Sequence, residues 1–292
     1  MALHGVKYKG WRRIGASHGA AGGILVISPD QLQEIEVLAE GGLEERPSFI
    51  RVRRIRLRHR YEGERFSAPY LFDILEGPFA DAVAIVLYSI DREEKIWVGL
   101  RRGVRPSIYL RKNNPAKAAL DGAPRLLYYE IVAGGIEYSD FKGLGVDGRA
   151  AREVREEAGF QVHPEDVVAL GEATVSSPAY GMEKIHYRAV RVDPEQARQP
   201  QGDGHPLEEV GDFQFHELTK AIAWCRSGVI QDSKTEIGLL RLAGFLGYLP
   251  ELGIWRHDLP PELERRFHRL GLSTIDDGER AYGSGNRSAD SA

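Results

Sequence analysis

The chain has 292 residues, 42% of them hydrophobic, and a net charge of −4 at pH 7. This composition suits a globular protein with a sizeable core and an appended region, and the charge argues against a dedicated nucleic-acid-binding protein. A single cysteine, Cys225, excludes an intramolecular disulfide framework, so we expect a cytoplasmic protein. Neither a secretion signal nor a membrane span is expected, because the sequence shows no suitable apolar segment.

The first 78 residues are predicted to form a small β-rich domain. From Ile50 to Tyr61, apolar residues alternate with arginines, which is typical of a half-buried strand. The alternation slips at Arg53 and Arg54, which predicts a bulge. Gly63 predicts a hairpin turn, followed by a return strand over residues 66–75.

The arginines of this strand allow two interpretations on chemistry alone. They are Arg51, Arg53, Arg54, Arg56, Arg58 and Arg60. A solvated sheet face that blocks edge-to-edge pairing is the favoured interpretation. A surface that binds a polyanion is the alternative.

Residues 79–250 carry the pattern of an α/β domain. Continuous apolar runs predict the buried strands of a mixed sheet, over residues 80–91, 95–103 and 126–135. Later strand-like runs cover 167–175, 184–192 and 210–216, and helices are predicted over 218–227 and 233–248. Ser233 and Glu236 match a capping box at the start of the last helix. Helices on each face of the sheet would give an α/β/α sandwich.

The last 42 residues, 251–292, differ in character from this domain. Residues 260–270 predict one amphipathic helix. From Ser273 onwards, the Gly/Ser/Asp-rich composition predicts a disordered tail.

The most informative segment is RAAREVREEAGF, residues 149–160. It predicts a helix over 148–158 with Asp147 as N-cap. Its small apolar residues lie on the face that packs on a sheet. The side chains that converge on the other face are Glu153, Glu156 and Glu157. Three such carboxylates repel one another unless a cation lies among them, and oxygen ligands favour Mg²⁺ or Mn²⁺. An ordinary solvated acidic helix is the alternative.

This segment resembles the C-terminal half of the Nudix box, Arg-Glu-(aliphatic)-x-Glu-Glu-x-Gly-(aliphatic). The matching positions are Arg152, Glu153, Val154, Glu156, Glu157, Gly159 and, as an aromatic in place of the aliphatic residue, Phe160. In the first half of the box, the family's glycine and glutamate would fall on Tyr138 and Leu144. An opening at Gly134 and Gly135, with an insertion of three or four residues before the helix, restores the match. The first box glutamate is then absent, or replaced by Glu137 or Asp140.

A second pattern overlaps this segment, because Gly143, Gly145 and Gly148 fit the dinucleotide fingerprint GxGxxG. That motif requires a strand directly before it. The preceding residues are polar, so we interpret these glycines as a flexible inserted loop rather than a nucleotide site.

The resemblance is to the ADP-ribose and nucleotide-sugar pyrophosphatase branch of the Nudix family. It implies a Nudix-type sandwich that uses Mg²⁺, or Mn²⁺, to hydrolyse nucleoside diphosphate-linked sugars to a nucleoside monophosphate and a sugar phosphate. The implied metal ligands are Glu153, Glu157, Glu156 as a ligand or an outer partner, and the Ala133 carbonyl. Arg152 would orient a box glutamate.

The resemblance also implies residues outside the box. Glu209 is the expected catalytic base, and Glu208 and Asp212 are the next candidates for this role. The substrate would be bound by Arg102, or Arg101 in its place, and by Pro178 of the SSPAYG segment and Glu208. The N-terminal domain would join two copies into a homodimer and reach the partner's substrate pocket.

Two other functions stay open. A non-catalytic Nudix-fold sensor of a nucleotide metabolite is favoured by Leu144 at the glutamate position. An RNA-end or dinucleotide pyrophosphatase is favoured by the arginine strand, although nucleic acid is not the expected substrate. A serine hydrolase is excluded, because no GxSxG elbow accompanies Ser177 and His186.

Overall fold

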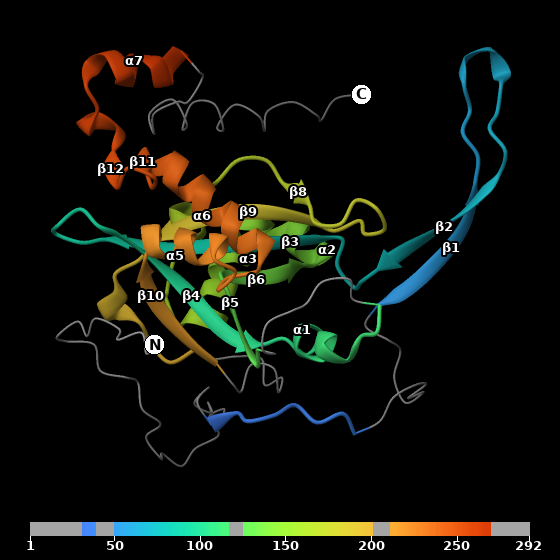
Figure 1. Ribbon diagram of the computed structural model, residues 1–292, viewed down its shortest axis with the longest axis horizontal. Helices are drawn as coiled ribbons and strands as arrows, with labels where there is room; N and C mark the ends of the chain where they lie inside the picture. Colours follow the sequence, from blue (N-terminus) through green and yellow to red (C-terminus); the bar gives the residue numbers. More distant parts are fainter. Residues whose placement is uncertain (1–30, 39–49, 117–124, 201–210, 270–292) are drawn as a thin grey trace.

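A central sheet with helices on both faces forms the body of the molecule, and one hairpin projects from it (Figure 1). The computed structural model describes residues 31–38, 50–116, 125–200 and 211–269. Within this part of the chain, no helix is long and apolar enough to cross a membrane.

The described strands of the body build one mixed sheet. They are β3 (Asp81–Ile90), β4 (Ile96–Val104), β5 (Leu127–Glu130), β6 (Val132–Ile136), β7 (Val168–Ala169), β8 (Thr174–Val175), β9 (Lys184–Arg191) and β10 (Gly211–Glu217). The main path runs β10-β4-β3-β9-β7, while β5 pairs with β4, β6 with β3 and β8 with β9. Strands β3 and β9 are parallel, and the other described pairs are antiparallel. The predicted run 126–135 is therefore divided at Ile131, where the chain changes its partner strand.

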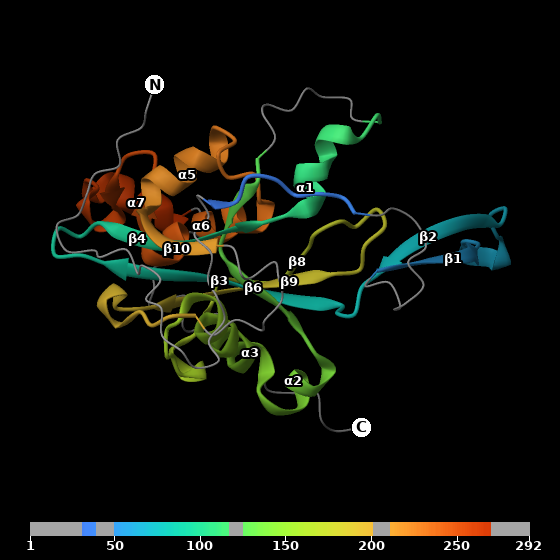
Figure 2. The ribbon, with the colours of Figure 1, turned by 90° about the horizontal axis from the view of Figure 1, so that it is seen from below.

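Alternate residues of β3 enter two separate cores. Ala84 and Val86 pack with α5 (Leu218–Arg226) and α6 (Ser233–Leu246) on one face. Val83, Ile85 and Leu87 pack with α3 (Gly145–Glu153) on the other, and all five side chains are fully buried. Figure 2 shows the sheet between these two helix layers. Burial of each valine, leucine or isoleucine side chain stabilises the fold by about 1.5–3 kcal/mol, and burial of the smaller alanine side chain contributes less. The predicted α/β/α sandwich is confirmed.

The segment before the acidic helix is helical and is not the predicted loop. Helix α2 (Tyr138–Gly143) is opened by a capping box between Glu137 and Asp140. Helix α3 then starts at Gly145, earlier than expected, with Leu144 rather than Asp147 at its N-cap. The prediction failed because the polar residues of this segment satisfy a helix N-terminus, and because Gly145, at φ +67°, turns the chain between the two helices.

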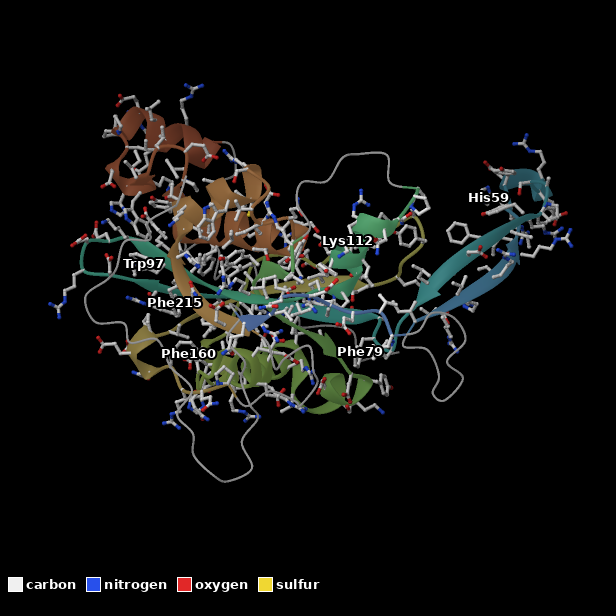
Figure 3. The ribbon with its side chains drawn as sticks, turned by 60° about the horizontal axis from the view of Figure 1, so that its bottom comes forward. His59, Phe79, Trp97, Lys112, Phe160 and Phe215 are labelled. Atoms are coloured by element: carbon white, nitrogen blue, oxygen red, sulfur yellow. The ribbon has the colours of Figure 1, made fainter. Side chains whose placement is uncertain are left out.

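A π-helical turn, η4 (Val154–Ala158), continues α3 and ends at Gly159. Gly159 has φ +75°, and a Cβ added there would lie 2.0 Å from the carbonyl oxygen of Arg198. Phe160 follows, buried edge-on against Phe213 and Phe215 of β10 at centroid distances of 6.1 and 6.0 Å. Figure 3 labels Phe160 and Phe215. This aromatic cluster explains an aromatic side chain where the Nudix pattern has an aliphatic one.

Gly159→Ala is expected to lower the free energy of unfolding by about 2 kcal/mol, because the methyl group meets backbone in a left-handed conformation. Gly145→Ala is the matched control, since its φ is also positive but no atom lies within 4 Å of the added Cβ. It should lower the free energy of unfolding by only about 1 kcal/mol. Urea unfolding of both variants measures the difference. Equal losses would show that the contact with Arg198 does not matter.

The described part of residues 1–78 contains one antiparallel hairpin of β1 (Arg51–Leu57) and β2 (Tyr70–Glu76). Its far end turns at Gly63, as predicted, with φ +70° in the short helix η2 (Glu62–Glu64). The predicted bulge is wrong, because the register runs without interruption from Arg51↔Glu76 to Leu57↔Tyr70. Both faces of the hairpin are largely exposed, so the alternation of apolar and charged residues can shift by one position without a bulge in the strand.

The remaining elements flank the sheet. They are α1 (Pro106–Leu110), η3 (Arg111–Asn113), η5 (Pro164–Asp166), η6 (Pro194–Gln196), β11 (Tyr248–Leu249), β12 (Ile254–Trp255), η7 (Arg256–Asp258) and α7 (Pro261–Arg269). Helix α7 confirms the predicted C-terminal helix. The N-cap of α6 is Asp232 rather than Ser233, because its carboxylate accepts a hydrogen bond from the Thr235 N–H at 3.1 Å. The predicted tail from Ser273 lies outside the described residues.

Candidate active site

The acidic helix crosses strand β6 at a glycine. A Cβ added to Gly134 would lie 2.1 Å from a carboxylate oxygen of Glu153, so only glycine lets this side chain lie against the strand. Glu153 is 6% exposed and forms an ion pair with Arg149, one turn earlier on α3. Arg149 also lies 3.8 Å from Asp140. Sequence alone predicted the glutamate, and the structure supplies the reason for the glycine beneath it.

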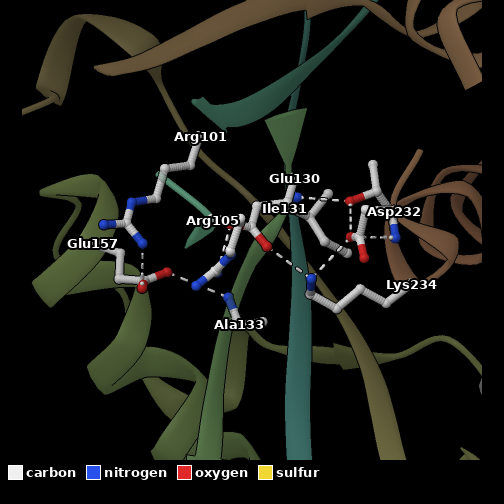
Figure 4. A network of polar contacts seen from close by, with 9 residues as sticks. Arg101, Arg105, Glu130, Ile131, Ala133, Glu157, Asp232 and Lys234 are labelled. Carbon is white, nitrogen blue, oxygen red and sulfur yellow. Dashed lines mark hydrogen bonds and ion pairs between the residues drawn. The ribbon is translucent and has the colours of Figure 1, made fainter. Parts of the chain in front are cut away.

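Glu157 is held between two strands. Its Oε1 accepts a hydrogen bond from Arg101 of β4 at 3.0 Å, and its Oε2 accepts one from the Ala133 N–H of β6 at 3.3 Å (Figure 4). The side chains of Arg101 and Glu157 are only 12% and 11% exposed. Burial raises the pKa of Glu157 to about 7, and the nearby charges of Glu153 and Glu130 add to this effect while Arg101 opposes it. The ionised form of Glu157 is therefore disfavoured unless a cation lies beside it.

The backbone of Ala133 also faces the acidic helix. The N–H and C=O of one residue in an extended strand point to the same edge. Since the Ala133 N–H reaches Glu157, its carbonyl lies on the same edge of β6. This is the oxygen that the Nudix resemblance assigns to a metal.

Glu156 lies farther out than the other two carboxylates. Its side chain is 24% exposed and accepts a hydrogen bond from Arg152 Nε at 2.9 Å, with Arg155 at 3.7 Å. The Arg152 contact is the one that an orienting role requires, and the role itself stays a prediction.

Asp140, one of the two carboxylates expected to replace the family's first box glutamate, is linked to the acidic helix, and its role stays a prediction. It is 6% exposed and is linked to Glu153 through Arg149, whereas Leu144 is 54% exposed. The buried carboxylate is thus supplied four residues before Leu144 by the capping box of α2.

The donor set suits a hard divalent ion, since it consists of carboxylate oxygens and a strand carbonyl. Burial raises the pKa of Glu157, and the charges of Glu153 and Glu130 raise it further; a divalent ion at this carboxylate would oppose both effects. Within the described ranges, however, no three acidic, histidine or cysteine side chains are already arranged around one point as metal ligands. Each box glutamate instead contacts an arginine, so ion binding requires at least one of these contacts to break.

Sequence reasoning missed a second cluster of charged side chains, centred on Glu130. Glu130, at the end of β5, is 3% exposed and pairs with Lys234 of α6 at 2.8 Å and with Arg105 (Figure 4). The Ile131 N–H donates to Thr235 Oγ1 at 2.9 Å. Burial alone would raise the pKa of Glu130, but Lys234 and Arg105 hold it below its usual value. One glutamate inside the apolar run LLYYEIVAGG was the available signal.

Arg102 and Asp212 are opposite each other on β4 and β10. Two hydrogen bonds join them, Nε to Oδ1 at 3.0 Å and Nη2 to Oδ2 at 2.8 Å. The adjacent Arg101, and not Arg102, contacts the box. Asp212 becomes the weaker candidate for a catalytic base, since both of its oxygens already accept hydrogen bonds.

The other predicted substrate-binding and base residues are not among the contacts of the acidic helix described above. Pro178 lies exposed in the turn after β8, and Tyr180 of this turn accepts a hydrogen bond from the Leu75 N–H of β2 at 2.8 Å. The SSPAYG segment therefore meets the base of the hairpin. Glu208 and Glu209 lie outside the described residues.

His216 of β10 is half-buried against Tyr129 and Trp224, and within the described structure its buried Nε2 has no hydrogen-bond partner. Burial, assisted by Lys220, lowers its pKa to about 4. The unfolded chain, with a pKa of about 6.5, binds this proton more readily, so stability is lost as pH falls from about 6.5 to 4. From pH 7.5 to 5, His216 should lower the free energy of unfolding by about 2 kcal/mol. In urea unfolding, the free energy of unfolding of His216→Phe should fall between pH 7.5 and 5 by about 2 kcal/mol less than that of the wild type. The fall for His257→Gln, a change at an exposed position, should match that of the wild type.

No protein-family model and no curated protein sequence matches the chain. A solved structure described as "Crystal structure of ADP compounds hydrolase" is similar at 15% identity and a TM-score of 0.46, over 72% of this chain and 90% of that one. This similarity is too weak to support an argument about function, so the candidate function depends on the residues described above.

Proposed function

We propose that this chain is a Nudix-type pyrophosphatase that uses Mg²⁺, or Mn²⁺, to hydrolyse a nucleoside diphosphate-linked sugar. The observation that supports this most directly is Glu157, a nearly buried carboxylate held against Ala133 of β6 and beside Glu153. A solvated acidic helix face does not bury carboxylates against a glycine strand. The products would be a nucleoside monophosphate and a sugar phosphate.

Glu153, Glu157 and the Ala133 carbonyl would hold the divalent ion, with Glu156 beside them. When bound, the ion supplies positive charge for phosphate oxygens and lowers the pKa of a bound water. Arg152 keeps Glu156 in place, and Arg149 does the same for Glu153. Glu209 would take the proton of the attacking water, since a carboxylate bound to the ion is a poor base. Arg101, beside Glu157, is better placed than Arg102 to contact a phosphate.

The testing experiment is phosphate release, coupled to an added phosphatase, from separate substrates with Mg²⁺, with Mn²⁺ and with EDTA. The substrates are ADP-ribose, UDP-glucose, GDP-mannose, NADH, diadenosine polyphosphates and 5′-triphosphate RNA. Cleavage of one diphosphosugar that EDTA abolishes is the expected result. Cleavage of RNA or of a dinucleotide alone would replace the proposed substrate class.

A sensor is the second candidate, and one observation favours it. Every box glutamate already contacts an arginine, so the acidic group is balanced without an ion. Thermal stabilisation by a nucleotide, without turnover under any metal condition, would identify the sensor.

The RNA-end alternative is weakened by the hairpin itself. Arg51 and Arg53 share Glu76, Arg54 pairs with Asp73, and Arg60 lies 4.0 Å from Glu64, so four of the six arginines have a carboxylate partner. A homodimer joined through this hairpin remains our proposal for the oligomeric state, and sedimentation analysis tests it.

A further inference from the structure

Glu157 differs from the other box glutamates in the origin of its cation. Arg149 and Arg152 each lie one helical turn before the carboxylates that they contact, Glu153 and Glu156. The cation of Glu157 is Arg101, which comes from strand β4. This ion pair therefore links the acidic helix to the sheet.

Arg101 can leave Glu157 without disturbing the other charged pairs of the site. Arg149 is shared between Asp140 and Glu153, and Glu130 keeps two cations of its own, Arg105 and Lys234. Arg101 instead contacts Glu157 through a single hydrogen bond at 3.0 Å, on Oε1. Its departure breaks one contact and leaves the other charged pairs intact.

We propose that Arg101 is an exchangeable countercharge: it neutralises Glu157 in the metal-free protein, gives way when the divalent ion binds, and then contacts a phosphate of the substrate. This inference rests on the proposed function. The physical reason is repulsion, because a guanidinium and a divalent ion on one nearly buried carboxylate oppose each other at short distance. Arginine suits the second role, since its planar donors match phosphate oxygens.

Two binding measurements test the proposal without turnover. Calorimetry with Mn²⁺ alone should show that Arg101→Gln binds the ion about tenfold more tightly than the wild type, because a competing cation is removed. With Mn²⁺ present, inorganic pyrophosphate should bind about tenfold more weakly to the same variant, because a phosphate ligand is lost. Arg101→Lys keeps the charge and should lie nearer the wild type in both titrations. If Arg101→Gln fails to fold, Arg101→Lys is the variant used to test the proposal.

Arg188→Gln is the matched control. Arg188 is 13% exposed and pairs with Asp147 of the same acidic helix, outside the box carboxylates. Its Mn²⁺ and pyrophosphate affinities should stay within about twofold of the wild type. A purely structural role for Arg101 predicts weaker binding of both ligands.

The outcomes separate this inference from the proposed function. If the wild type binds Mn²⁺ and Arg101→Gln binds it equally or more weakly, the countercharge is refuted while the metal site stands. If neither protein binds Mn²⁺, the metal-dependent function fails, and the countercharge fails with it.

Discussion

Glu157→Gln should lower turnover of the diphosphosugar more than about a thousandfold and should weaken Mn²⁺ binding, because the substitution removes an anionic ligand whose side chain is only 11% exposed. The fold should survive. Glutamine keeps an oxygen that can accept the Ala133 N–H, and the substitution removes a charge whose burial raises its pKa to about 7. Circular dichroism checks the fold, calorimetry the metal affinity, and phosphate release the activity.

Glu209→Gln is the comparison for this variant. A base that does not bind the ion predicts reduced turnover, by about a hundredfold or more, with Mn²⁺ affinity near that of the wild type. Equal loss of Mn²⁺ affinity in both variants would contradict the assignment of Glu209 as base. Full activity in Glu157→Gln would contradict the proposed active site altogether.

The second large effect concerns stability. Glu130→Gln should lower the free energy of unfolding by about 3 kcal/mol, because Lys234 and Arg105 lose the carboxylate between them in a nearly buried position. The double variant Glu130→Gln/Lys234→Gln should regain part of this loss, since it removes an ammonium group that the single variant leaves with Asp232 but without Glu130. Urea unfolding of the wild type, both single variants and the double variant gives the coupling free energy.

Glu251→Gln provides the control for this cycle. Glu251 and Arg226 lie 2.7 Å apart, as close as Glu130 and Lys234, but both side chains are 57% exposed. Solvent screening should make their contribution much smaller than that of Glu130. If Glu130→Gln is no more damaging than Glu251→Gln, then Glu130 contributes no more than a surface ion pair.

The sheet, both helix layers and the C-terminal helix were predictable from the sequence. Apolar periodicity reports burial directly, and alternate residues of β3 entering two cores gave a clear pattern. The segment from Tyr138 to Gly143 was mistaken for a loop because its helix depends on the Glu137 and Asp140 capping box and has few apolar residues. Short polar helices lack the periodic signal by which helices are recognised.

The candidate site was predictable where its residues lie close in sequence. Helical spacing placed Glu153, Glu156 and Glu157 on one side of the chain, and the Nudix resemblance gave them roles. The partners from distant segments were not predictable, because neither pattern nor propensity shows which side chains meet across strands. Arg101 is 56 residues from Glu157, and Lys234 is 104 residues from Glu130.

The hydrogen bond from Ile131 to Thr235 also bears on how the protein is synthesised. It spans 104 residues and anchors the start of β6, the strand that carries Ala133 and Gly134, to helix α6. On the ribosome, the acidic helix emerges well before α6, and domains form their long-range contacts only after both segments are available. A nascent chain that ends before Ser233 thus contains the whole box sequence without the anchor of β6, and enzyme activity should appear only late in translation.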